Sequence, residues 1–231
     1  MHSSISQQLI LMQLSDSFFP TGSFTLSHGL ETLVQTRQVQ SVADVQTFLQ
    51  ILLRNKVGVT DTVALIHAHR GSQNKDLGVI RHADRQLFIQ TAIAKNRATQ
   101  RQSGRALLMV AGETWPDKRI EILQQDAVQG KIHALHPVIF GAIAAVAGLE
   151  ERDAVLGFLH GLVTGILGAA IRLSVIGHRQ AQQVLRAIAP DIEAAWTMAT
   201  TMPLEQMWSC TPTIDIAQMR HAKLPQRLFA N

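Results

Sequence analysis

A glycine stands at every fourth position in the stretch Gly157-Phe158-Leu159-His160-Gly161-Leu162-Val163-Thr164-Gly165, which continues as Ile166-Leu167-Gly168-Ala169-Ala170. Glycine inside a helix costs about 1 kcal/mol relative to alanine, so several together need a structural reason. The usual reason is close approach, because small residues on one face let another segment pack against the helix backbone. We therefore predict a central, largely buried helix here. The alternative is that part of its small-residue face contacts another subunit.

Helix-start signals recur along the rest of the chain. Ser41, followed three residues later by Asp44, has the form of a capping box. The apolar residues that follow on one helical face are Val42, Val45, Phe48, Leu49 and Leu52. Pro137 and Pro190 each stand where a first helical turn would begin.

Apolar residues at helical spacing also begin at Leu77, in a segment expected to reach Val110 with or without a break. The stretch after Met202 is expected to be loop. No long run alternates apolar and polar residues, and no Asn-Gly or Asp-Gly turn occurs. The sequence predicts an all-α fold: a single-domain helical bundle over 1–231, of about eight to ten helices, with a buried central Gly/Ala-rich helix.

Composition excludes several classes of protein. The chain has 231 residues, 46% of them hydrophobic, which is enough for a packed core and too many for a disordered chain. The single cysteine, Cys210, excludes an internal disulfide and fits a cytoplasmic location. The start of the chain lacks the pattern of an export leader, and its most apolar stretches, 137–149 and 161–171, are shorter than the roughly 20 residues that cross a bilayer. We expect no membrane association.

No pattern in the sequence points to catalysis or to a bound metal. His67 and His69 would lie on nearly opposite sides of a helix, and a helix start at Pro137 would separate His133 from His136. No G-x-S-x-G turn, P-loop or G-x-G-x-x-G motif is present. We expect no enzyme activity, no cofactor and no intrinsic metal site.

Basic residues form a ladder in one four-residue register. Its members are Arg81, Arg85, Arg97, Arg101 and Arg105, with Lys95 nearby. If the helix is continuous, these cations form a stripe along it. The stripe is either a solvated helix face or a docking surface for an acidic protein. Nucleic acid is the third alternative, since no aromatic platform accompanies the stripe.

Motifs at both ends of the chain are similar to those of one known family. The N-terminal motif is Leu14-Ser15-Asp16-Ser17-Phe18-Phe19-Pro20-Thr21-Gly22-Ser23-Phe24, running on to Ser27-His28-Gly29-Leu30-Glu31. The inner motifs are His136-Pro137-Val138-Ile139-Phe140-Gly141 and Ala169-Ala170-Ile171-Arg172-Leu173. The tail, from Pro212 to Phe229, includes Arg220-His221 and closes with Arg227-Leu228-Phe229. Together they resemble the signatures of urease accessory protein F.

This resemblance implies a urease maturation chaperone that is required for nickel insertion into apo-urease. Proteins of this kind are all-α homodimers without a catalytic site of their own. They bridge accessory protein D (called H in some organisms) and the nickel-carrying GTPase, accessory protein G, whose GTP-dependent nickel delivery they regulate. A partner can set the state of a GTPase through differential contacts without itself holding nucleotide.

The resemblance also suggests which residues bind partners. The expected partner-binding residues are Phe24, Arg220, His221, Arg227, Leu228 and Phe229. Phe24, in a loop with Pro20 and Gly22, is an aromatic anchor of the type that interfaces favour. Arg227 offers a planar set of donors that lysine lacks. We expect Phe24 and Arg227 to lie near one another, with the tail, 203–231, ordering fully only when accessory protein D binds.

Two other functions remain open from the residues alone. A basic helical regulator that binds nucleic acid would bind DNA or RNA with an affinity that falls steeply as salt is added. A small hydrolase using His136 or Ser15 is the remote alternative. Stable co-elution with accessory proteins D and G would instead identify the maturation chaperone.

Overall fold

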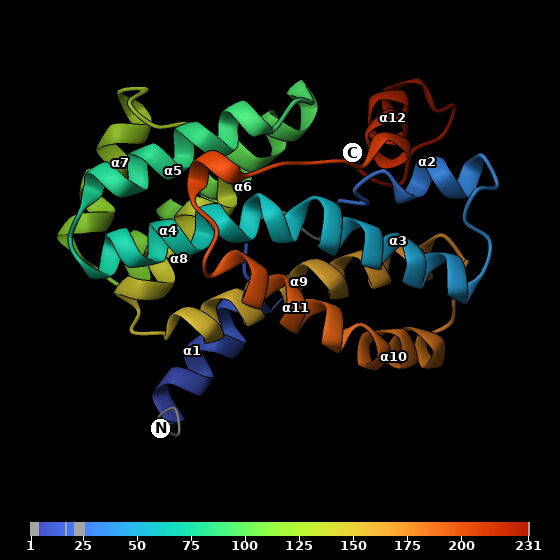
Figure 1. Cartoon of the computed structure of the whole chain (residues 1–231), viewed down its shortest axis with the longest axis horizontal. Helices are drawn as coiled ribbons and strands as arrows, with labels where there is room; N and C mark the ends of the chain where they lie inside the picture. The colour runs from blue at the N-terminus through green and yellow to red at the C-terminus, as the bar shows by residue number, and fades with distance from the viewer. Residues whose placement is uncertain (1–4, 17, 21–25, 231) are drawn as a thin grey trace.

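The computed structural model describes residues 5–16, 18–20 and 26–230 (Figure 1). Every regular element within these residues is a helix, which confirms the predicted all-α bundle. The α-helices are α1 (Ile5–Ser15), α2 (Leu30–Gln35), α3 (Val42–Asn55), α4 (Asp61–Gln73), α5 (Leu77–Gln90), α6 (Ala94–Thr114), α7 (Lys118–Val128), α8 (His136–Val146), α9 (Glu151–Arg172), α10 (His178–Ala187), α11 (Ala189–Ala199) and α12 (Pro212–Arg220). Short 3-10 helices are η2 (Val57–Val59), η3 (Leu204–Gln206) and η4 (His221–Lys223).

The predicted helix starts lie where the local signals place them. The Asp44 amide donates to Ser41 Oγ over 3.2 Å and the Ser41 amide donates to Asp44 Oδ2 over 2.9 Å, so the capping box of α3 is complete. Pro137 lies in the first turn of α8 and Pro190 in the first turn of α11, where a missing amide costs nothing.

The structure decides one alternative that the sequence left open and corrects one expectation. The segment from Leu77 to Val110, expected with or without a break, is two helices, because the chain is non-helical from Thr91 to Ile93. The stretch after Met202, expected to be loop, contains α12, which starts at Pro212 and buries Ile214 and Ala217. Short helices such as α2 and α12, with 6 and 9 residues, account for a total somewhat above the expected eight to ten.

One hydrophobic core joins helices that are far apart in sequence. It includes Leu14 of α1, Leu65 of α4, Ile139 of α8, Ile166 of α9 and, from the end of the chain, Phe229. The tightest helix contacts in this core occur at two glycines outside α9. A Cβ at Gly141 of α8 would collide with the backbone of Leu65, and one at Gly104 of α6 would collide with the backbone of Ala134.

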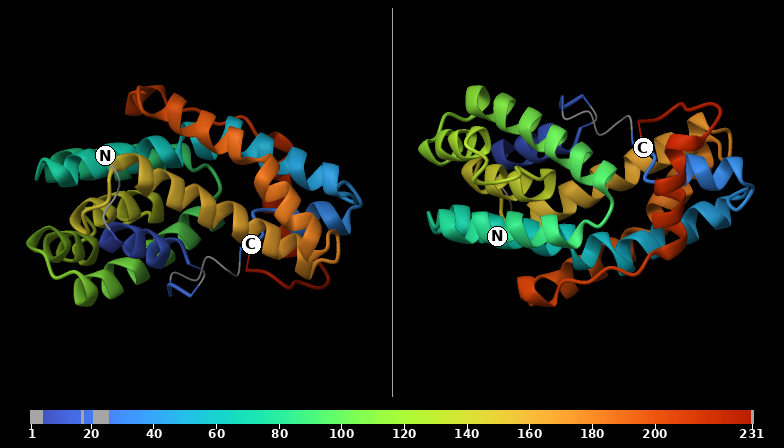
Figure 2. Two further views of the ribbon diagram at one scale, coloured as in Figure 1. Left: turned by 90° about the horizontal axis from the view of Figure 1, so that it is seen from below. Right: turned by 90° about the horizontal axis from the view of Figure 1, so that it is seen from above.

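The predicted central Gly/Ala-rich helix is α9, which runs through the middle of the molecule between α8 and α10 (Figure 2). Its glycine face is only partly covered. A Cβ at Gly157 would meet Leu11 Cδ1 and Ser15 Oγ of α1, each at 2.6 Å, whereas no atom of the described residues lies within 4 Å of one built at Gly165 or Gly168. The glycines of α9 therefore make room for α1 at one end and leave an open face farther along.

By length and composition, α9 could also cross a membrane. Its 22 residues are longer than the apolar stretch recognised in the sequence, and an 18-residue window has a mean hydropathy of 2.0. However, 56% of that window is buried inside the protein, as in the core helix of a globular domain.

Candidate partner-binding site at the C-terminal segment

The end of the chain folds back onto α2, close to the N-terminal motif. We call residues 212–230, which comprise α12, η4 and the seven residues after it, the C-terminal segment. Figures 1 and 2 both show α12 beside α2. The two motif-rich ends of the sequence therefore meet in space.

Gly29, the residue just before α2, packs against α12. It has φ +90°, in the left-handed region that favours glycine. A Cβ at this position would also lie 3.0 Å from Gln218 Cγ and 3.2 Å from the Ile214 carbonyl oxygen. Both the backbone conformation and the contact with α12 thus require a residue without a side chain.

Glu31, two residues later, holds the end of the chain. Its carboxylate is fully buried, with 0% exposure, and accepts three hydrogen bonds. The donors are His221 Nε2 at 2.7 Å, the Leu228 amide at 2.6 Å and the Phe229 amide at 3.3 Å. A buried carboxylate is tolerated only when it is paired in this way, so Glu31 acts as the internal anchor of the C-terminal segment.

A third motif supplies the other side of this anchor. The guanidinium carbon of Arg172, at the end of α9, lies 4.3 Å from the centroid of the Phe229 ring. Gln35 Nε2 donates to the Gln226 carbonyl oxygen over 2.9 Å. The last residues of the chain are therefore held by α2 and α9 together.

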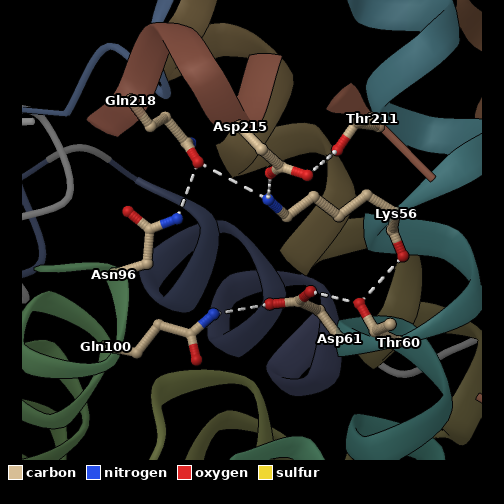
Figure 3. A network of polar contacts seen from close by, with 8 residues as sticks. All are labelled: Lys56, Thr60, Asp61, Asn96, Gln100, Thr211, Asp215 and Gln218. Atoms are coloured by element: carbon tan, nitrogen blue, oxygen red, sulfur yellow. Dashed lines mark hydrogen bonds and ion pairs between the residues drawn. The ribbon is translucent and has the colours of Figure 1, made fainter. Parts of the chain in front are cut away.

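A polar network also holds α12, through Asp215 and Gln218 (Figure 3). Lys56 Nζ, just after α3, lies 2.5 Å from Asp215 Oδ1 and 3.5 Å from Gln218 Oε1. Asn96 Nδ2 in the first turn of α6 donates to the same Gln218 oxygen over 2.7 Å. Thr211 Oγ1 donates to Asp215 Oδ2 over 3.2 Å. These contacts tie α12 to α3 and α6.

Beneath this network lies a second buried acid. Asp61, at the start of α4, accepts from Gln100 Nε2 over 2.8 Å, and Thr60 Oγ1 lies 2.8 Å from its Oδ2 (Figure 3). Burial raises the pKa of Asp61, against the opposing effect of these hydrogen bonds and of the Lys56 charge.

A cavity of about 880 Å³ separates the polar network from apolar side chains of α1 and α9. Two histidines that line it have lowered pKa values. Burial lowers the pKa of His136 to about 4, and burial together with the Lys56 charge lowers that of His28 to about 4. Both are neutral at neutral pH.

The histidines considered as metal ligands have other surroundings. His67 Nε2 lies 3.1 Å from the Met202 carbonyl oxygen, and His69 Nε2 lies 2.9 Å from that of Leu149. His133 stacks on Phe88. Among residues 5–16, 18–20 and 26–230, no group of three or more His, Cys, Asp or Glu side chains could hold a metal ion.

The predicted partner-binding residues divide into two groups. Arg220, Arg227 and Leu228 are exposed, Leu228 by 68%. His221 and Phe229 are buried, at 3% and 6% exposure. His221 and Phe229 can therefore contribute to a partner surface only by positioning their exposed neighbours. Phe24, and with it the expected proximity of Phe24 to Arg227, lies outside the described residues.

Sequence reasoning did not single out Glu31 and Arg172 as site residues, although both stand in the quoted motifs. A charged residue between apolar ones, as in Leu30-Glu31-Thr32-Leu33, is the local signal for a buried charge. Its partners, about 190 residues away, leave no trace in the local pattern.

Comparison with known proteins identifies the family of this chain. The UreF family model matches residues 39–189, which is well over half of the chain. The chain belongs to the UreF family. This confirms the resemblance drawn from the motifs.

Full-length relatives extend the match to both ends. A urease accessory protein UreF from Trichodesmium erythraeum is 69% identical over 230 residues, covering 100% of this chain and 99% of the relative. Proteins of the same name from Rhodopseudomonas palustris and from Bacillus sp. strain TB-90 are 30% and 25% identical. These alignments cover 95% and 97% of this chain, and 90% and 99% of the relatives. The alignment with the Trichodesmium protein thus spans Glu31 and the C-terminal segment, which lie outside the residues that the family model matches.

Proposed function

We propose that this UreF-family protein is a urease maturation chaperone required for nickel insertion into apo-urease. It acts in the cytoplasm as a homodimer without enzymatic activity of its own. It bridges accessory protein D (H) and the GTPase accessory protein G, and regulates GTP-dependent nickel delivery. Nickel is the cargo of the assembly, and the chain itself needs no cofactor. Membership of a family named for urease accessory function supports this proposal.

The C-terminal segment supplies the structural support. Glu31 bonds the amides of Leu228 and Phe229, so the exposed Arg227 and Leu228 side chains are presented from an anchored backbone. A guanidinium and an apolar side chain held in place are typical of interface anchors, because little side-chain freedom is then lost on binding. This arrangement is the observation on which the proposal rests.

The single domain, 1–231, would carry residues 203–231 as a tail whose final conformation depends on its partner. Accessory protein D would complete its ordering, and the GTPase would then bind the surface that contains Arg227, Arg220 and Phe24. The positioning of His221 and Phe229 by Glu31 would prepare the tail for this step.

The test is nickel loading of apo-urease, reconstituted with accessory proteins D and G and with or without this protein. Omission of this protein should abolish activation at limiting nickel. Arg227→Ala and Phe24→Ala should keep the fold, dimerisation and D binding but lose GTPase recruitment and urease activation. Arg179→Ala, at an exposed arginine of α10, is the matched control. Normal recruitment by both Arg227→Ala and Phe24→Ala would contradict the proposed partner surface.

A further inference from the structure

The basic ladder seen in the sequence does not form one stripe, because α5 ends at Gln90 and α6 begins at Ala94. Three of its members nevertheless come together around His133, in the connection between α7 and α8. Arg85 lies one turn before Phe88 on α5, and Arg101 lies one turn after Arg97 on α6, so both are on the turns next to the Phe88–Arg97 contact. Burial lowers the pKa of His133, the Asp84 charge raises it, and the charges of Arg101, Arg85 and Arg97 lower it further. Tertiary packing thus gathers residues of α5 and α6 into one cationic cluster.

Phe88 forms the centre of this cluster. The His133 ring stacks on it, with 3.6 Å between centroids and 10° between planes. The guanidinium carbon of Arg97 lies 5.1 Å from the same centroid, and Arg97 Nη1 donates to the carbonyl oxygens of Thr91 and Ala92 over 2.7 and 3.2 Å. Arg97 and His133 are therefore held in place by the protein itself.

The acid nearest to the cluster is already engaged. Asp84 is buried at 1% exposure and accepts from the His133 amide over 2.5 Å and from the Leu135 amide over 2.9 Å, one bond to each oxygen. Burial raises its pKa, against the opposing effect of these two hydrogen bonds and of the His133 and Arg101 charges. Asp84 therefore serves the backbone of the α7–α8 connection and does not pair with the arginines.

Two guanidinium groups in the cluster consequently keep their donors free. Arg81 pairs with Asp126 and Arg119 pairs with Asp117. Within the part of the chain that the structure describes, Arg85 and Arg101 make no hydrogen bond or ion pair. Each guanidinium carries five N–H donors in a planar fork, so these two can each bind a carboxylate in bidentate fashion.

We propose that Arg85 and Arg101, supported by Arg97 and His133, form a docking surface for an acidic segment of a partner protein. Carboxylates fit this surface better than a nucleic acid does. Base stacking needs an accessible aromatic ring, and the Phe88 ring is already covered by His133 and Arg97. This inference is independent of the function proposed above for the C-terminal segment.

The experiment compares full-length wild-type protein with Arg85→Glu/Arg101→Glu. The matched control is Arg179→Glu/Arg186→Glu, which reverses two exposed arginines of α10 and leaves the same net charge. The probes are a fluorescein-labelled deca-glutamate peptide, a labelled single-stranded DNA and a labelled DNA duplex. Binding is followed by fluorescence anisotropy at low and at physiological salt, after circular dichroism has shown that each variant is folded.

The peptide should bind the wild type with a salt-dependent affinity. Arg85→Glu/Arg101→Glu should raise the Kd for the peptide about tenfold or more, and the α10 control by about twofold or less. Arg85→Lys/Arg101→Lys, which keeps the charge and removes the fork, should weaken binding to an intermediate degree. Equal loss in the α10 control, or no binding by the wild type at low salt, would overturn the proposal. Tighter binding of either DNA through the same two arginines would overturn it too, and would make nucleic acid the occupant.

Discussion

Single residues decide how the C-terminal segment is held. The buried Glu31 carboxylate is removed from water and accepts hydrogen bonds from three donors near the end of the chain instead. These are His221 Nε2 and the amides of Leu228 and Phe229. A buried charge that loses such partners is strongly destabilising, so the three contacts depend on one another. The exposed side chains of Arg227 and Leu228 lie next to these bonds and take their position from them.

Glu31→Gln tests this anchor. The glutamine amide keeps one acceptor oxygen, but it removes the negative charge and turns its own N–H groups towards the donors that faced Glu31. We therefore expect the free energy of unfolding to fall by about 1–3 kcal/mol. Trypsin should also cleave faster after Arg220, Lys223 and Arg227, because the segment is released more often. Denaturant unfolding and mass spectrometry of the digest measure the two effects.

Glu113→Gln is the control, since Glu113 is exposed and makes no hydrogen bond or ion pair within the described residues. It should match the wild type in both assays. Tail cleavage at the wild-type rate in Glu31→Gln would show that Glu31 does not hold the segment.

A comparison of Gly29 with Gly130 separates the free-energy cost of backbone strain from that of the contact with α12. Gly29 and Gly130 both have positive φ, +90° and +72°, but only Gly29 has neighbours, Gln218 and Ile214, within 4 Å of a Cβ. Gly130→Ala should lose roughly 1–2 kcal/mol from backbone strain alone. Gly29→Ala should lose at least about 1 kcal/mol more, since α12 must also move. Equal unfolding free energies for the two variants would mean that the contact with α12 carries no cost.

At the scale of helices, the glycines that are most conspicuous in the sequence are not the ones that another segment approaches most closely. The glycine-rich helix α9 draws attention in the sequence, yet the tightest backbone contacts occur at Gly141 of α8 and Gly104 of α6. These two glycines let α8 approach α4 and let α6 approach the chain just before α8. In the part of the chain that the structure describes, Gly165 and Gly168 of α9 have no neighbour within 4 Å of a Cβ.

Alanine substitutions should therefore have opposite effects in these helices. Gly141→Ala should destabilise the protein by about 1–3 kcal/mol or more, because the methyl group meets the Leu65 backbone, which cannot move aside cheaply. Gly165→Ala should stabilise the monomeric fold by about 0.5–1 kcal/mol, because alanine is the better helix former and the space is open. Thermal and denaturant melting measure both. A destabilising Gly165→Ala would mean that the open face of α9 is covered in solution, as in the proposed homodimer.

At the scale of the whole molecule, the cavity beside the polar network makes stability depend on pH. His28 and His136 have pKa values of about 4 in the folded protein and 6.5 when unfolded. Each therefore contributes stability that is fully present above pH 6.5 and is lost as the pH falls from 6.5 towards 4. Asp61 and Asp84, whose pKa values are raised, act in the opposite direction, because their protonation on acidification favours the folded state.

His136→Leu isolates the histidine contribution. The variant has no imidazole to protonate, so its free energy of unfolding should fall less between pH 7.5 and pH 5 than that of the wild type. His178→Leu, at the exposed start of α10, should keep the wild-type pH dependence. Urea unfolding at a series of pH values provides the comparison. A His136→Leu slope as steep as the wild-type slope would show that the pKa of His136 is the same in the folded and unfolded states.

Local chemistry made the helical class of this protein predictable. Three local signals act within one or two helical turns: the capping box at Ser41 and Asp44, prolines at first turns, and apolar residues at helical spacing. Their effects can therefore be predicted from the sequence. The motifs at both ends likewise led to the UreF family, because a motif match does not require knowledge of the path between its parts. The break at Thr91 was left open by the sequence, since it interrupts a continuous apolar pattern. The helix α12 was missed, since it is stabilised by distant partners.

By itself, then, the sequence determined the all-α class, most helix starts, the central helix α9 and the family. Only the tertiary structure decided that Glu31 holds the end of the chain, that His221 and Phe229 are buried, and that Arg85 and Arg101 lie around one histidine. The physical reason is the separation along the sequence over which each kind of interaction acts. Helix formation depends on residues three or four positions apart, whereas these interactions join residues from 32 (133 − 101) to 198 positions apart, which the packing of one shared core brings together.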